Sequence, residues 1–199
     1  MIFPRLTLVP APPLEDEVYS VNKAAQWVNA GTGSLVKLLA SKYLSDLRVS
    51  QLMALRSAPF VNGSRTIPLL QVAVAAREDP RVTWRTHVGD SPNLSDEEWC
   101  NAVRGDWRGI NAHEINKIGY LLIGMGGVVT GVLKITGIDE NSSPSRVRFQ
   151  GQALGRLRSD LATGLQTKDA SASKPEKQLV QTVLGQRFEP RAGGSFIWL

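Results

Sequence analysis

The segment Gly119–Gly151 constrains the fold of this chain more than any other: GYLLIGMGGVVTGVLKITGIDENSSPSRVRFQG. Two apolar runs flank Gly126-Gly127, and paired glycines supply the positive φ angles of a two-residue hairpin turn. Successive side chains of a strand point to opposite faces of its sheet. The segment therefore predicts an antiparallel hairpin with one buried face. The residues of that face are Val129, Leu133 and Ile135.

The basic side chains of this segment occupy the alternate positions, which point to the opposite face. Lys134 lies in the second predicted strand, and Arg146, Arg148 and Gln150 alternate with apolar residues in RVRFQG. The pattern predicts one sheet with an apolar inner face and a polar, basic outer face. Such a face is either ordinary solvated surface or a surface on which a polyanion lies.

The N-terminal part of the chain predicts helices. The opening PRLTLVPAPP is punctuated by prolines and is typical of an edge strand or an extended arm. Apolar residues then recur at helical spacing, most clearly in a helix that we expect Ser34 to cap. A further helix is expected near 50–57. We therefore divide the chain into 1–58, an N-terminal arm and helical cluster, and 59–199, a β-barrel-like domain with a basic C-terminal part.

Shorter signals complete the predicted fold. Ser95 with Glu98, and Asn111 with Glu114, have the spacing of helix capping boxes. ALGRLRSDLATG predicts a helix, QTKDASASKPEKQ is typical of a mobile loop, and the apolar GSFIWL predicts a last strand tied into the core. Together these patterns predict an α+β protein: a small, mainly antiparallel, partly open β-barrel with a helical N-terminal cluster.

The charge of the chain is uneven. Among 199 residues, Lys and Arg number 23 and Asp and Glu 18, a formal net charge of +5. The segment 141–199 holds nine basic and four acidic residues, so the whole excess lies there. A localised basic field favours encounter with nucleic acid, although moderate basicity also serves solubility alone.

Composition argues against several other classes. The single cysteine, Cys100, excludes an internal disulfide and a cysteine-rich zinc site, and two histidines make a histidine-based metal site improbable. We expect neither a metal nor a cofactor. No apolar run has the length of a spanning helix, and the N-terminus lacks a signal-peptide pattern. We therefore expect a cytoplasmic protein without membrane contact.

The segment RGDWRG carries the most suggestive polar cluster. Arg104, Trp107 and Arg108 place two guanidinium groups and an aromatic plane within a few residues of one another. Such groups pair with phosphate and stack on bases. The alternative is a packing role for the tryptophan, with Arg104 paired to a nearby aspartate.

The candidates for catalysis are weaker. Cys100 with His87 and Asp90 forms a conceivable nucleophilic triad, but a lone cysteine is more often a small buried residue. The carboxylates in DEEW lie at a predicted helix N-terminus, where the helix dipole explains them. The sequence does not disclose a reaction.

A longer segment, about 103–154, resembles a pattern in uncharacterised bacterial proteins. It comprises an Arg-Gly-x-Trp turn, a short helix, a Gly-centred hairpin, VVxGVxxI and an RxxFxG strand. The matching positions are Arg104, Gly105, Trp107, Tyr120, Gly127, Gly131, Arg146, Phe149 and Gly151. The C-terminal NPIRYVN of that pattern is not evident. The resemblance implies a small β-barrel similar in outline to PUA-like and EVE-like nucleic-acid readers.

These observations lead to three hypotheses. The first is a nucleic-acid-binding protein, for DNA rather than RNA, within a bacterial defence or restriction system. Its predicted contact residues are Arg104, Trp107, Arg108, Lys134, Arg146, Arg148 and Gln150. The second is a metal-independent nuclease or glycosylase on the same polymer, with Cys100, His87, His113 or Tyr120 as base or nucleophile. The third is a protein-interaction subunit of a larger complex. The N-terminal helices are candidates for a homodimer contact.

Overall fold

The computed structural model describes residues 16–61, 66–79, 81–143, 145–191 and 195–199, and within them the chain forms six helices and eight strands. The predicted N-terminal arm lies outside these residues. The helices are α1 Val21–Val28, α2 Thr32–Ser41, α3 Val49–Ser57, α4 Asp96–Val103, α5 Ala112–Ile118 and α6 Lys174–Val183. The strands are β1 Pro68–Gln71, β2 Ala76–Arg77, β3 His87–Val88, β4 Tyr120–Met125, β5 Val128–Ile138, β6 Phe149–Leu157, β7 Gln166–Lys168 and β8 Phe196–Trp198.

A mixed six-stranded sheet is the centre of the fold. Its strand order is β7-β6-β5-β4-β1-β8, in which β1 and β4 are parallel and the other neighbours antiparallel. Strands β2 and β3 form a separate two-stranded ladder. Among the described residues, β7 and β8 are the edges of the large sheet, so it is not closed. The α+β class is confirmed, whereas the barrel outline is not.

The hairpin predicted at the sequence level is confirmed. Strands β4 and β5 pair from Met125↔Val128 onward, and Gly126 and Gly127 turn between them with φ of 56° and 87°. The three residues of the expected inner face, Val129, Leu133 and Ile135, are buried. The other face of β5 is also buried over much of its length, because a helix covers it as well.

Helices α4 and α6 lie on opposite faces of the sheet. A Cβ atom added at Gly131 would lie 2.2 Å from the ring of Trp99 in α4, and one at Gly155 would lie 2.5 Å from Val180 in α6. Strand β6 is therefore buried from Leu154 to Leu157 on both faces. This double burial removes the alternation of a half-exposed strand, and for that reason the helix predicted for ALGRLRSDLATG is wrong.

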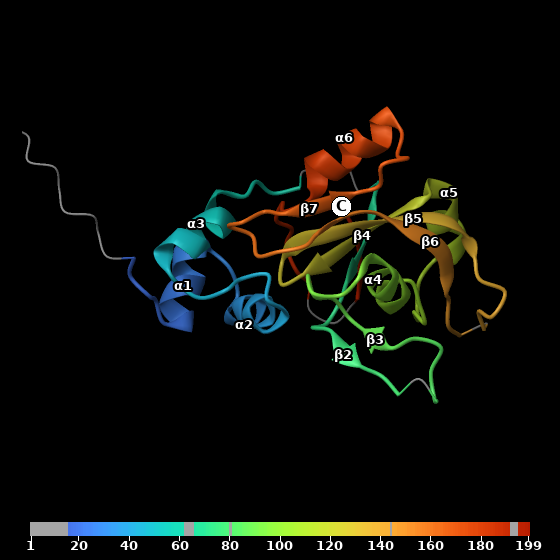
Figure 1. The fold of residues 1–199 in the computed structure, drawn as a ribbon, viewed down its shortest axis with the longest axis horizontal. Coiled ribbons are helices and arrows are strands. Elements are labelled where there is room, and N and C mark those ends of the chain that lie inside the picture. Colours follow the sequence, from blue (N-terminus) through green and yellow to red (C-terminus); the bar gives the residue numbers. More distant parts are fainter. Residues whose placement is uncertain (1–15, 62–65, 80, 144, 192–194) are drawn as a thin grey trace, which may run out of the picture.

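The helical cluster gathers at one end of the molecule, beside the hairpin turn (Figure 1). Helix α2 begins at Thr32 rather than after Ser34 and ends at Ser41, because Lys42 adopts a left-handed φ of 73°. The change of direction turns the side chain of Tyr43 into the core, where it is fully buried. Within the described segments, no helix combines the length and the apolar character needed to cross a membrane.

Several capping and terminal predictions are confirmed. Ser95 and Glu98 form the capping box of α4, and the Asn111 side chain accepts from the backbone N–H of Glu114 at the start of α5. Strand β8 pairs with β1. The loop predicted for QTKDASASKPEKQ is wrong, because it contains β7 and the start of α6. Ser173 and Glu176 form a capping box there.

A buried polar network joins three separate parts of the chain. The carboxylate of Asp90 accepts hydrogen bonds from the hydroxyls of Tyr43 at 2.8 Å and Thr130 at 2.5 Å. Burial raises the pKa of Asp90, while these two hydrogen bonds and the charge of Arg156 oppose the rise. The buried indole N–H of Trp99 forms no hydrogen bond with a described residue, yet it is close enough to Asp90 to lower the same pKa. The network fixes the helical cluster and the loop after β3 against β5.

Glu176 attaches α6 to the sheet. Its carboxylate accepts from Lys134 of β5 at 2.7 Å and from the backbone N–H and hydroxyl of Ser173 at 2.7 Å each. The ammonium of Lys134 and these two donors lower the pKa of Glu176 from 4.5 to about 2. The folded state therefore holds this carboxylate in its charged form.

We expect Gly127→Val to lower the free energy of unfolding by about 1–3 kcal/mol, because a β-branched residue resists positive φ. The added Cβ would also lie 3.2 Å from Pro190. Gly33→Val is the matched control, since Gly33 lies in α2 with open space around an added Cβ. Urea unfolding measures both variants. Equal stability of the two would show that the turn does not require glycine.

The lowered pKa of Glu176 predicts acid sensitivity. A carboxyl group whose folded pKa is depressed stabilises the protein above its unfolded pKa and loses that stabilisation as the pH falls through the folded value. We therefore expect the wild type to lose more stability between pH 4.5 and about 2 than Glu176→Gln does. Unfolding curves across this range measure the difference, with exposed Glu140→Gln as the control. Parallel curves for wild type and Glu176→Gln would contradict the assignment.

Candidate functional site

Trp84 lies at the centre of a cluster of arginines. The guanidinium carbons of Arg148, Arg104 and Arg85 lie 4.0, 4.7 and 5.7 Å from its ring centroid. The three arginines come from the residue before β6, the C-cap of α4 and the loop before β3. Positive charge is stabilised over an aromatic face, so Trp84 holds together cations that would otherwise repel one another.

Asp106 is the acidic centre of this cluster. One carboxylate oxygen accepts from Arg148 Nε and Nη2 at 3.2 and 3.1 Å, and the other accepts from the Trp84 indole at 3.0 Å. Burial favours a higher pKa for Asp106. The bonds from Trp84 and Arg148, with the charges of Arg148 and Arg85, outweigh it and lower that pKa. A charged Asp106 therefore holds the fork of Arg148 in one orientation.

Arg85 is held within the fold rather than presented to solvent. Its Nε donates to Glu78 at 2.8 Å, and its Nη1 donates to the carbonyls of Ala102 and Gly105. Arg104 differs, because its Nε is buried without a hydrogen-bond partner. The charges of Arg148 and Arg104 also reach Asp139, whose pKa is lowered first by the backbone N–H of Asn141. The three arginines around Trp84 therefore interact with three carboxylates, Asp106, Glu78 and Asp139.

Arg108 and Arg146 extend the same edge into solvent. Trp107 and Val147 form an antiparallel bridge, which places Arg108 opposite Arg146. Both arginines are exposed, and neither forms an ion pair with a residue that the structure describes. We call Arg104, Arg108, Arg146 and Arg148, together with Trp84, the arginine edge.

Trp107 itself is turned toward the core. Its indole N–H donates to the carbonyl of Val103 at 2.8 Å, and its ring packs against the buried apolar residues. The arrangement matches the packing alternative, and the base-stacking role stays a prediction. Trp84 is the aromatic residue that the sequence analysis missed. The only signal for it was its neighbour Arg85 in the segment RVTWRTHV.

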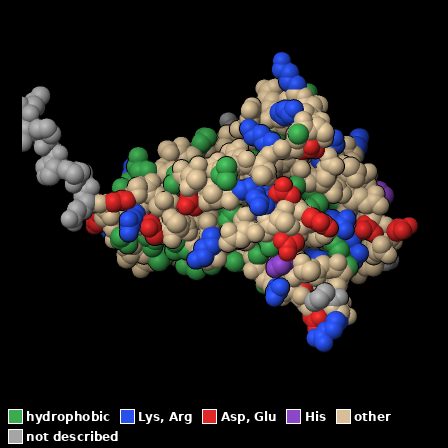
Figure 2. Space-filling view, in the orientation of Figure 1, with side chains coloured by type: hydrophobic (Ala, Val, Ile, Leu, Met, Phe, Trp, Pro, Cys, Tyr) green, Lys and Arg blue, Asp and Glu red, His purple; other side chains and the backbone are tan. Residues whose placement is uncertain are grey.

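The remaining predicted contact residues are not at the arginine edge. Lys134 is paired with Glu176 on the α6 side of the sheet. Gln150 is exposed in β6 and lies beside Gly137 of β5. On the face shown in Figure 2, Lys and Arg side chains are interspersed with Asp and Glu rather than gathered in one patch. The single basic face indicated by alternation is therefore divided between two sides of the sheet.

A groove of about 520 Å³ runs between α4 and strands β6 and β7. Cys100 lines it and donates its S–H to the carbonyl of Gly151 at 3.2 Å, and burial raises the pKa of the thiol. His87 Nδ1 lies 3.9 Å from Glu98 rather than beside the cysteine. Asp90 is buried in its own network. The triad of Cys100, His87 and Asp90 is therefore not assembled.

In the described ranges, no three His, Cys, Asp or Glu side chains are grouped so that they could hold a metal ion. Comparison with protein-family models, with curated proteins and with solved structures gives no match. The resemblance noted for 103–154 stays a prediction. The geometry of the arginine edge is accordingly the basis for the functional proposal.

Two neighbouring arginines of this edge should differ in their structural roles. We expect Arg148→Ala to lower the free energy of unfolding by about 2 kcal/mol, because Asp106 loses a charge-assisted pair in a half-buried position. Arg146→Ala should change it by less than about 0.5 kcal/mol, since the side chain is exposed. Arg148→Lys keeps the charge but not the fork. Urea unfolding of the three variants is the measurement, and equal effects of both alanine variants would contradict the Asp106 assignment.

Proposed function

We propose that the protein binds nucleic acid at the arginine edge. The observation that carries the proposal is the stacking of Arg104 and Arg148 on Trp84, with Arg108 and Arg146 on the bridge beside them. Among the described residues, Asp106 is the only carboxylate within ion-pair distance of these four arginines. Two of the arginines, Arg108 and Arg146, form no ion pair with any residue in the described ranges. Arginine forks that are free to donate suit phosphate oxygens.

The residues of the arginine edge have different roles in the proposed binding. Arg108 and Arg146 project into solvent and contact backbone phosphates. Arg104 contributes charge over the ring of Trp84. Arg148 serves mainly as a positioning residue, because Asp106 already holds two of its nitrogens. The partly exposed edge of Trp84 offers a surface against which a base can lie.

The finer parts of the proposal come from the sequence. DNA rather than RNA as the ligand, and a place in a bacterial defence or restriction system, follow from the resemblance of 103–154. A PUA-like outline follows from the same resemblance, and a cytoplasmic location is proposed from the other sequence patterns described above. The open sheet supplies no independent argument for the outline, and the binding proposal does not depend on it.

The alternative functions have less support from the side chains. A nuclease or glycosylase needs an activated nucleophile or base, and the raised pKa of Cys100 opposes thiolate formation. The hypothesis of an interaction subunit or homodimer draws on two half-exposed apolar side chains of the N-terminal helices, Val36 and Met53. Exposed apolar residues of this number are normal on a soluble surface, so we rank this hypothesis second.

The test is a salt titration of binding to labelled single-stranded and duplex DNA and RNA. We expect the double variant Arg108→Ala/Arg146→Ala to bind more weakly while retaining wild-type stability. Its log–log slope of affinity against salt should be shallower by about 0.9 per lost phosphate contact on duplex DNA, or about 0.7 on a single strand.

Lys174→Ala/Lys177→Ala is the matched control, because it removes the same charge from exposed positions on α6. This control should leave the slope nearly unchanged. A wild type without salt-sensitive affinity for any of the four polymers would refute the proposal. Equal losses in both double variants would show a diffuse charge effect rather than a site.

A further inference from the structure

Arg187 is a buried arginine without an acidic partner in the part of the chain that the structure describes. Only 7% of it is exposed, and it lies in the segment after α6 that pairs with Phe60 and with Val128 of the hairpin. No carboxylate among the described residues lies within ion-pair distance of it. Burial lowers the pKa of its guanidinium, and no neighbouring charge offsets that effect. A buried cation without a counter-charge is unfavourable, so its presence requires an explanation.

The internal contacts of Arg187 explain only part of its burial. Its Nη2 donates to the carbonyl of Asn29 at 2.6 Å, and its guanidinium carbon lies 4.6 Å from the centroid of Phe60. Asn29 is the C-cap of α1, where a cation is stabilised by the helix dipole. One carbonyl, however, satisfies one of the five N–H groups of an arginine.

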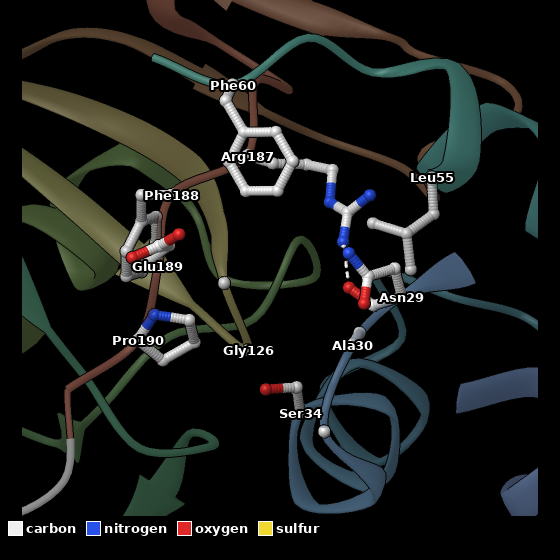
Figure 3. Close-up of a pocket in the computed structure, with 12 residues that line it drawn as sticks. Asn29, Ala30, Ser34, Leu55, Phe60, Gly126, Arg187, Phe188, Glu189 and Pro190 are labelled. Atoms are coloured by element: carbon white, nitrogen blue, oxygen red, sulfur yellow. Dashed lines mark hydrogen bonds between the residues drawn. The ribbon is translucent and has the colours of Figure 1, made fainter. Parts of the chain in front are cut away.

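The guanidinium borders a cavity of about 400 Å³ between the hairpin turn, the α1–α2 junction and the segment 187–190. Figure 3 shows the hydroxyl of Ser34 and the guanidinium of Arg187 on either side of the same open space. The Ser34 hydroxyl makes no hydrogen bond within the described residues. Glu189 also lines the cavity but forms no ion pair with Arg187. The apolar side chains of the lining include Leu55, Phe188 and Pro190.

The start of α2 adds to the positive character of this cavity. Its N-cap, Gly31, lines the wall, and no side chain caps the helix. The first N–H groups of a helix lack internal acceptors and carry partial positive charge. The cavity therefore combines a cationic fork, a hydroxyl donor and a positive helix end with apolar walls, in a volume typical of small-molecule sites.

We propose that this cavity binds a small organic oxyanion, a phosphate or carboxylate group carried on an apolar body, with Arg187 as the anion-binding residue. The oxyanion lies between Arg187 and Ser34, and the apolar body lies against Leu55 and Pro190. The site is separate from the arginine edge and does not depend on nucleic-acid binding.

Thermal unfolding and calorimetric titration of the full chain test the proposal. The probes are inorganic phosphate, adenosine 5′-monophosphate and benzoate, with uncharged adenosine as the matched control. We expect a rise in Tm and measurable binding with at least one organic anion and none with adenosine. Whether the monophosphate or benzoate binds more tightly identifies the preferred oxyanion.

Two variants locate the binding. Arg187→Met keeps the apolar stem and should weaken binding of the effective probe by about tenfold or more, since it removes a charge-assisted pair. Ser34→Glu places a carboxylate in the first turn of α2, where acidic residues are favoured, opposite Arg187. It should raise the Tm without ligand and abolish binding, because the new carboxylate occupies the place of the anion. Arg56→Met is the control, as Arg56 also stacks on an aromatic ring but is exposed.

The outcomes separate a ligand site from a helix cap. If no probe binds the wild type, or if Arg187→Met lowers the Tm but leaves binding of the probe intact, Arg187 only caps α1 and the proposal is overturned. Should Arg187→Met fail to fold, Ser34→Glu decides the question alone. Nucleic-acid affinity of Arg187→Met should equal that of the wild type, so failure of one proposal does not imply failure of the other.

Discussion

The carboxylate of Asp90 is the interaction on which most of this structure depends. It is fully buried, and it accepts hydrogen bonds from the hydroxyl of Tyr43, just after α2, and from the hydroxyl of Thr130 in β5. Burying a carboxylate is costly unless donors surround it. The fold is therefore stable only when the segments that carry Tyr43, Asp90 and Thr130 come together. The loop that contains Trp84 and Arg85 is anchored at its far end by Asp90, and the arginine edge is thereby placed against α4.

Arg156 and Arg187, the two buried arginines among the described residues, are stabilised in different ways. Arg156 is fully buried, but the carbonyls of Leu94, Ser95 and Ser91 accept from its nitrogens, and Asp96 lies 3.6 Å away. Arg187 donates to one carbonyl and lies against one aromatic ring. The first arrangement is a structural solution that joins β6 to the start of α4. The second leaves N–H groups without an acceptor among the described residues at the border of a cavity, which is the property expected of a binding residue.

Local patterns predicted the elements whose stability is local. The Gly126-Gly127 turn, the two capping motifs and the apolar terminal strand are confirmed because their conformations follow from the residues themselves. The second half of strand β6, from Ala153, and helix α6 were not predicted correctly. Burial on both faces of the sheet conceals the alternation of β6. The polar composition of the segment before α6 concealed its capping box, formed by Ser173 and Glu176.

The sequence by itself determined the α+β class, the hairpin, the helical N-terminal part and the excess of positive charge in the last 59 residues. Only the tertiary structure decided where that charge acts. It placed Arg148 against Asp106 and Trp84, and it paired Lys134, which precedes that segment, with Glu176 on the α6 side of the sheet. It also buried Arg187 beside a cavity. The physical reason is that backbone conformation responds to neighbours along the chain, whereas the strength of a charge depends on burial and on partners distant in sequence.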